Sequence, residues 1–192
     1  MKYFEYFKQI DSRINIEVYP LKHDEDNSPL GLYRIACECI IKSPNNQNPK
    51  YEFLENDEVW FVIDSDKDKL DTRKPQIAEL RHKCDLHKWN VAQSNPCFEV
   101  WLHNHLFNDI PVLDEMDRCI SWKQYVNKRI GSGFDSRRHP IFINDAISNS
   151  IASFSKTNGV PDVGSTEVYN LGVSIYALVK MQIENIRASN GL

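Results

Sequence analysis

The chain has 192 residues, a formal net charge of −4 and five cysteines. This length and an ordinary apolar content suffice for one sizeable core with a small helical appendage, and the net charge gives no overall attraction to nucleic acid, so that any such binding requires a local basic patch. No apolar stretch approaches the ~20 residues that cross a bilayer, the N-terminus lacks the apolar segment of a signal peptide, and the odd, scattered cysteines indicate reduced thiols in the cytoplasm.

Strands and helices are predicted to alternate over the first part of the chain. In order, we expect a helix ending near Ile10, a strand over residues 14–19, a helix starting at Asn27-Ser28-Pro29, a strand over 57–63, a helix opened by Pro75 and running to about His87, a strand over 88–92, and a helix that Asn95-Pro96 starts and that extends to about Phe107. This alternation favours β-α-β units, and therefore an α/β fold with a parallel sheet.

The pattern changes after residue 109. Residues 122–130, 141–155 and 167–186 are predicted to be helical, and Gly131-Ser132-Gly133 and Asn158-Gly159-Val160-Pro161 join them. We therefore expect an α/β core over residues 1–109 and a helical C-terminal extension over 110–192 that packs on it.

Asp64 and Asp66 follow directly after the apolar strand predicted over residues 57–63. Side chains two residues apart in an extended segment face the same way, and open α/β sheets bind their ligands beyond the carboxyl ends of parallel strands. Two carboxylates there are typical of a divalent-metal site. The alternative is a solvated polar turn, since residues 64–71 are rich in acids and lysines throughout.

A third acid, Glu99, lies in the segment Ser94-Asn95-Pro96-Cys97-Phe98-Glu99-Val100-Trp101. If Asn95 caps the helix and Pro96 occupies its first turn, Glu99 lies near the same edge of the sheet as Asp64 and Asp66. The alternative is that Glu99 only favours the positive end of the helix dipole or pairs with His103.

Two other candidate groups are less informative. His103 and His105 point to different faces of a helix and cannot chelate one metal together, and the apolar neighbours of His105 favour a core histidine. Residues 128–139 form the only dense basic segment, in which Lys128, Arg129, Arg137 and Arg138 flank two glycines. Such a loop suits a phosphate backbone, but it is equally typical of a solvated loop.

Taken together, two segments resemble the RloB-like proteins: Trp60-Phe61-Val62-Ile63-Asp64-Ser65-Asp66, followed after a helix by Ser94 to Leu102. The segment from Ser165 to Leu171 also resembles the start of the last helix in that family. The resemblance covers most of the chain and is strongest over residues 57–106.

The resemblance implies a Toprim-type fold, in which helices flank a parallel sheet and the C-terminal part is mainly helical. It implies a Mg²⁺- or Mn²⁺-dependent nuclease of DNA or RNA in anti-phage defence, often beside a partner ATPase of the AAA or ABC type. Asp64 and Asp66 match the Asp-x-Asp motif of Toprim enzymes, and Glu99 matches the acid of the Asn-Pro segment. A homo-oligomer is among the assemblies left open.

The family also opens with a strand that ends in a Glu-Gly-rich motif, followed by a helix with a Tyr-Phe pair. Tyr3-Phe4 stands at the start of this chain, so the resemblance implies a chain that begins just after that glutamate, for which Glu5 is a poor substitute. Two functions therefore stay open: a nuclease, or a catalytically incomplete Toprim module that binds a partner ATPase or nucleic acid.

Overall fold

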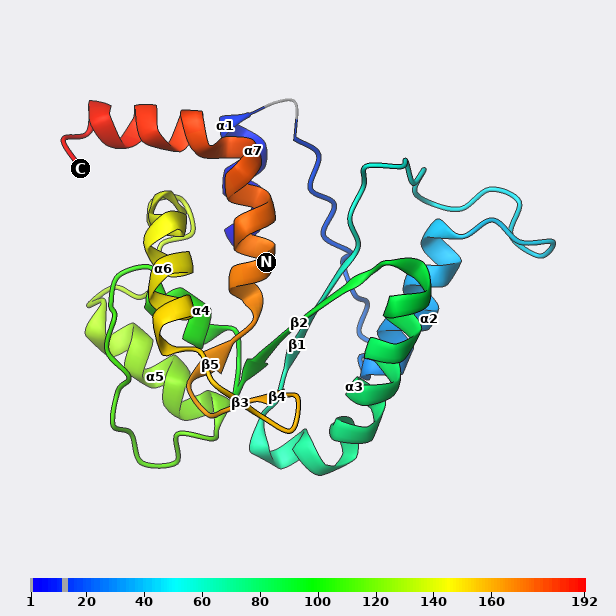
Figure 1. The fold of residues 1–192 in the computed structure, drawn as a ribbon, viewed down its shortest axis with the longest axis horizontal. Helices are drawn as coiled ribbons and strands as arrows, with labels where there is room; N and C mark the ends of the chain where they lie inside the picture. Colours follow the sequence, from blue (N-terminus) through cyan, green and yellow to red (C-terminus); the bar gives the residue numbers. More distant parts are fainter. Residues whose placement is uncertain (1, 12–13) are drawn as a thin grey trace.

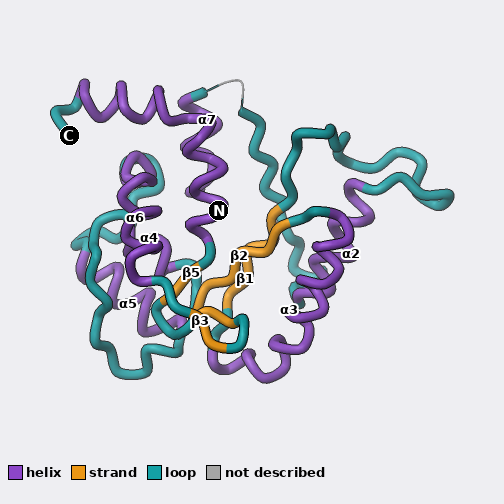
Figure 2. Tube along the Cα trace, viewed as in Figure 1, coloured by secondary structure: helices purple, strands orange, loops and turns teal. Residues whose placement is uncertain are grey.

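A small mixed sheet lies between two layers of helices in the computed structural model, which describes residues 2–11 and 14–192 (Figures 1 and 2). The strand order is β1-β2-β5. Strand β1 (Trp60–Asp64) runs parallel to β2 (Asn90–Asn95), and β2 pairs antiparallel with β5 (Ser165–Thr166). The predicted combination of helices with a sheet is confirmed. The predicted parallel sheet is found only in the β1-β2 pair, because β5 makes the sheet of the described residues mixed.

The helices α2 (Pro29–Ile40) and α3 (Lys67–His87) form one layer, at the right of Figure 1. The side chains of a strand alternate between the two faces, so Phe61 and Ile63 of β1 point into this layer and pack with residues of α3. Ser28 caps α2 by accepting a hydrogen bond from the backbone N–H of Gly31, as the sequence predicts for a serine before a proline.

The opposite face carries the larger layer. It consists of α1 (Lys2–Ile10), α4 (Glu99–Asn104), α6 (Ile143–Ser153) and α7 (Val168–Ser189). Trp101 is fully buried here, and a Cβ atom placed on Gly172 of α7 would lie 2.7 Å from its ring. A glycine at position 172 therefore allows α7 to approach α4 closely.

Four further elements complete the described chain. Helix α5 (Cys119–Arg129) packs against α4, and the 3₁₀-helix η1 (His139–Phe142) leads into α6. Strands β3 (Lys156–Thr157) and β4 (Val160–Pro161) form a hairpin whose turn residues, Asn158 and Gly159, both have positive φ. No helix among the described residues combines the length and the apolar character needed to span a membrane.

Several predicted elements have different bounds or do not form. The predicted strand over residues 14–19 is wrong: these residues have no regular secondary structure, because their apolar side chains pack partly against the larger core without a strand beside them. Pro75 does not open its helix; α3 begins at Lys67 behind the cap Asp66, and Pro75 lies inside it.

The prediction that Asn95 and Pro96 start a helix is also wrong. Asn95 is the last residue of β2, the Asn95-Pro96 peptide bond is cis, and α4 begins only at Glu99. The reason lies far along the chain, since the Asn95 side chain donates a 2.8 Å hydrogen bond to the carbonyl of Pro161 and cannot serve as a cap.

In the second half of the chain, the three predicted helices correspond to α5, to η1 with α6, and to α7. The strands there are not predicted from the sequence, and β5 joins the central sheet. The division into a core over residues 1–109 and an extension over 110–192 stays a prediction.

Candidate functional site

Asp64 is the last residue of β1 and faces the helix layer that contains α4. Its Oδ1 atom accepts a 3.0 Å hydrogen bond from the backbone N–H of Phe98, and its side chain is partly buried. Burial, and next the negative charge of Glu99, raise the pKa of Asp64 to about 6. The structure therefore brings Asp64 and Glu99 together as two carboxyl groups that repel one another.

Glu99 is the first residue of α4, in the segment that follows β2, and lies near the Asp64 carboxyl group. Its charge is the main cause of a raised pKa of Lys123, an exposed residue of α5. The alternative pairing with His103 does not form, since the His103 side chain contacts Asp109 instead. Lys123 is thus a cation beside the two acids that the sequence pattern did not reveal.

Asp66, two residues after Asp64, is the N-cap residue of α3. Burial opposes ionisation, but hydrogen bonds from Cys119 and from the Asp68 backbone outweigh it and hold the pKa of Asp66 below its usual value. Asp66 is thus an ionised cap of α3, and it shares this end of the sheet with Asp64 and Glu99. We call these three residues the acidic rim.

The acidic rim is not a preassembled metal centre. Among the described residues, no three histidine, cysteine, aspartate or glutamate side chains lie close enough together to hold an ion between them. The carboxyl ends of β1 and β2, where the rim lies, point toward the bottom of Figure 1, beside α5 and the β3–β4 hairpin.

A buried polar network lies directly behind the rim. Glu167 accepts hydrogen bonds from Arg81 at 2.5 Å and from the backbone N–H of Gln93 at 3.1 Å. The Gln93 side chain donates in turn to Ser65 Oγ at 2.6 Å, between the two aspartates. The segment Ser165-Thr166-Glu167 stood out in the sequence, but nothing there identified Arg81 or Gln93 as its partners.

A family model shows which protein family the chain belongs to. The family model of the RloB-like proteins matches residues 1–180. The chain belongs to the RloB-like family. No curated protein and no solved structure matches it.

His105 of this RloB-like chain is a core residue. His105 is 2% exposed, and its two ring nitrogens contact Tyr3 Oη at 3.0 Å and the Trp101 carbonyl at 2.9 Å. Burial lowers the pKa of His105 to about 3, so its ring is neutral. The prediction of a core histidine is confirmed.

Cys97 is also buried, and a hydrogen bond with Cys119, followed by burial, raises its pKa, which fits an unreactive thiol.

The four predicted nucleic-acid contacts divide into two kinds. Arg129 is held by an ion pair with Asp109 at 2.6 Å, and its guanidinium lies over the ring of Phe107. Arg137 and Arg138 have side chains 87% and 84% exposed, with Asp135 at 3.7 and 3.8 Å. Lys128 is exposed in the last turn of α5. In the described structure these residues make no contact with the acidic rim, and their role stays a prediction.

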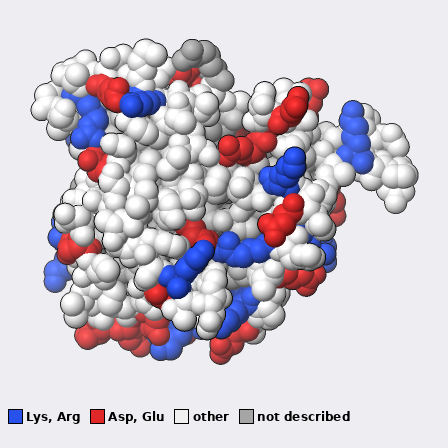
Figure 3. Space-filling view, in the orientation of Figure 1, with Lys and Arg blue, Asp and Glu red and all other residues white. Residues whose placement is uncertain are grey.

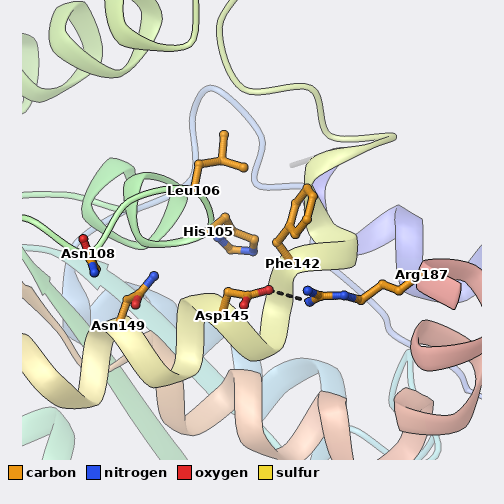
Figure 4. A pocket seen from close by; sticks show the side chains of 7 residues that line it. All are labelled: His105, Leu106, Asn108, Phe142, Asp145, Asn149 and Arg187. Atoms are coloured by element: carbon orange, nitrogen blue, oxygen red, sulfur yellow. Dashed lines mark hydrogen bonds and ion pairs between the residues drawn. The ribbon is translucent and has the colours of Figure 1, made fainter. Parts of the chain in front are cut away.

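Neither of two surface hollows includes the acidic rim. One, of about 380 Å³, has Arg187 and Asp145 facing each other in a 2.5 Å ion pair beside Phe142 (Figure 4). The other, of about 570 Å³, is lined by Trp89 and His87 near the start of β2. On the face shown in Figure 3, acidic and basic side chains are interspersed, without a broad area of one sign. The acidic rim therefore does not lie in either of these two hollows.

Proposed function

We propose that this protein is a Toprim-type phosphodiesterase that cleaves DNA or RNA with the help of Mg²⁺ or Mn²⁺, in anti-phage defence. The observation that supports this proposal is the convergence of Asp64 and Glu99, with Asp66 nearby, at the carboxyl end of two parallel strands. Open α/β sheets bind ligands at this edge.

The donor chemistry of the rim fits a hard divalent cation. Carboxylate oxygens are the ligands that Mg²⁺ prefers, and it often takes only one or two of them while keeping water molecules. The repulsion between Asp64 and Glu99, visible in the raised pKa of Asp64, would be relieved by a positive ion between them. A bound metal would activate water and stabilise the leaving oxygen of a phosphodiester.

The residues of the chain have separate roles in this proposal. Asp64, Asp66 and Glu99 would hold the metal, and because the pKa of Asp64 is raised to about 6, this residue would have to lose its proton first, so that metal binding would strengthen above about pH 6. Lys123 faces the acids and offers a positive charge to a phosphate group. The basic segment with Lys128, Arg129, Arg137 and Arg138 holds the nucleic-acid backbone farther away.

One observation favours a second function. The acids of the described chain do not form a ready metal-binding cluster, which is what a catalytically incomplete Toprim module would show. Such a module would bind a partner ATPase or nucleic acid without cutting it.

A metal titration combined with a cleavage assay tests the two functions. Mn²⁺ binding is measured by calorimetry for the natural chain, for Asp64→Ala and for Asp71→Ala, an exposed acid of α3 that serves as the control. Cleavage of labelled DNA and RNA is then followed with Mg²⁺ present. We expect Asp64→Ala alone to lose binding and cleavage. Equal cleavage by all three chains would refute the site, and nucleic-acid binding without metal binding would establish the second function.

A further inference from the structure

The network behind the acidic rim connects the last strand of the sheet to the residue between the two aspartates. Glu167 follows β5, Gln93 lies in β2, and Ser65 follows β1. The three side chains are almost completely buried, with exposures of 7%, 1% and 1%. The backbone N–H of Gln93 donates a hydrogen bond to the Glu167 carboxylate, and the side-chain amide of Gln93 donates one to Ser65 Oγ.

Ser65 is held from three directions. Its backbone N–H lies 3.0 Å from the carbonyl of Ser94 and 2.8 Å from that of Pro96, while its hydroxyl oxygen accepts from Gln93. Asp64 and Asp66 are its neighbours in the chain, so the orientation of Ser65 fixes the directions in which both carboxylates leave the backbone. A loosened Ser65 would let the two acids separate.

Glu167 and Arg81 keep Gln93 in place. Arg81 donates both to Glu167 and, at 3.0 Å, to the side-chain oxygen of Gln93, so the Gln93 amide has a partner on each end. The side-chain orientation of Gln93 therefore depends on an ion pair whose acid comes from position 167. A buried network of this kind keeps one geometry only while all its members are satisfied.

We propose that Glu167, acting through Gln93 and Ser65, is a positioning residue for the acidic rim. This inference rests on the proposed function, because it assigns the network to the metal site. Residues behind the ligands of a metal site orient those ligands, and their loss commonly weakens metal binding by roughly 10- to 100-fold.

The test compares three single variants and one double variant. Glu167→Gln keeps the size of the side chain and removes its charge, Ser65→Ala removes the hydroxyl, and the double variant combines the two. Asp145→Asn is the matched control, because it also breaks an arginine–carboxylate pair at 2.5 Å that involves α7, but away from the rim. Mn²⁺ affinity is measured by calorimetry, and hydrogen exchange is followed in a peptide that spans residues 60–68.

We expect Glu167→Gln and Ser65→Ala each to weaken Mn²⁺ binding about tenfold and to speed exchange around Ser65, with Asp145→Asn unchanged in both. The double variant should lose much less affinity than the sum of the single losses, because both act through one network. Full additivity would overturn the inference, as would an effect of Asp145→Asn equal to that of Glu167→Gln.

The exchange measurement separates this inference from the proposed function. If the natural chain binds no Mn²⁺, the proposed function fails; faster exchange at 60–68 in Glu167→Gln, absent in Asp145→Asn, would still establish the link from Glu167 to Ser65. If Mn²⁺ binds and Glu167→Gln changes neither affinity nor exchange, the positioning role is wrong while the metal site stands.

Discussion

Replacing Asp64 by asparagine should stabilise the metal-free protein at alkaline pH. The pKa of this carboxyl group rises from 3.8 to about 6 on folding, so the folded chain binds the proton more tightly than the unfolded chain. Its stability is then highest below the unfolded pKa and decreases as the pH rises through about 6. Two pKa units correspond to about 3 kcal/mol, an upper value because Asp64 is only partly buried.

Asparagine removes this penalty and keeps the one hydrogen bond that the structure shows. Its side-chain oxygen can still accept from the Phe98 backbone N–H, while the charge that Glu99 repels is gone. For a chain of this size about 3 kcal/mol corresponds to roughly 6–12 °C in melting temperature. Thermal melts with a chelator present, at about pH 8 and at about pH 4, measure the difference.

Asp66→Asn is the control, and its effect should have the opposite sign. The pKa of Asp66 is lowered on folding, so its ionised form contributes stability that is present above the unfolded pKa and lost as the pH falls through the folded pKa. We therefore expect Asp66→Asn to be less stable than the natural chain at about pH 8. If Asp64→Asn melts no higher than the natural chain at that pH, or if its gain persists unchanged at about pH 4, the electrostatic reasoning fails.

Three further outcomes follow from the structure. Adding Mg²⁺ at about pH 8 should raise the melting temperature of the natural chain but not that of Asp64→Asn, since only a ligand of the folded state stabilises it; equal rises would contradict metal binding at Asp64. Gly172→Ala should lower the free energy of unfolding, measured in urea, by about 1–3 kcal/mol, because the added Cβ would lie 2.7 Å from Trp101; an unchanged value would mean that α7 moves aside. The double variant Arg137→Ala/Arg138→Ala should weaken nucleic-acid binding and reduce its dependence on log salt concentration by about 2; an unchanged slope would remove both residues from the interface.

The parallel pair of strands was within reach of the sequence because its signals are local. A continuous β-branched and aromatic run from Val59 to Ile63 defines β1, and the acids that follow mark its carboxyl end. The position of Asp64 at the end of that strand, and its proximity to Glu99, could be predicted although the helix start at Asn95 was wrong. The family resemblance, likewise, rested on local segments and required no knowledge of distant contacts.

Strand β5 and the network behind the rim could not be predicted in the same way. A strand of two residues, Ser165 and Thr166, is too short to show any periodicity. It forms because the Thr166 hydroxyl lies 2.7 Å from that of Ser94 and because Asn95 pairs with Ser165, contacts that join segments about seventy residues apart. The pairing of Arg81 with Glu167 also joins distant segments, so no local pattern predicts it. The hydrogen bond from Asn95 to the distant carbonyl of Pro161 likewise explains why the local capping signal of Asn95 misled.

The last three residues of β2 are polar although they are buried, and this bears on the role of the network behind the rim. Gln93, Ser94 and Asn95 are buried at a place where apolar residues would pack without needing partners, and each depends on a contact with residues 161–167. Natural sequences depart from locally consistent choices mainly at functional or strained sites. The repulsion between Asp64 and Glu99 is a second departure at the same end of the sheet. These two departures, one polar and one electrostatic, lie beside each other at Asp64 and Ser65, and this is the arrangement that we expect if the acidic rim is a binding site.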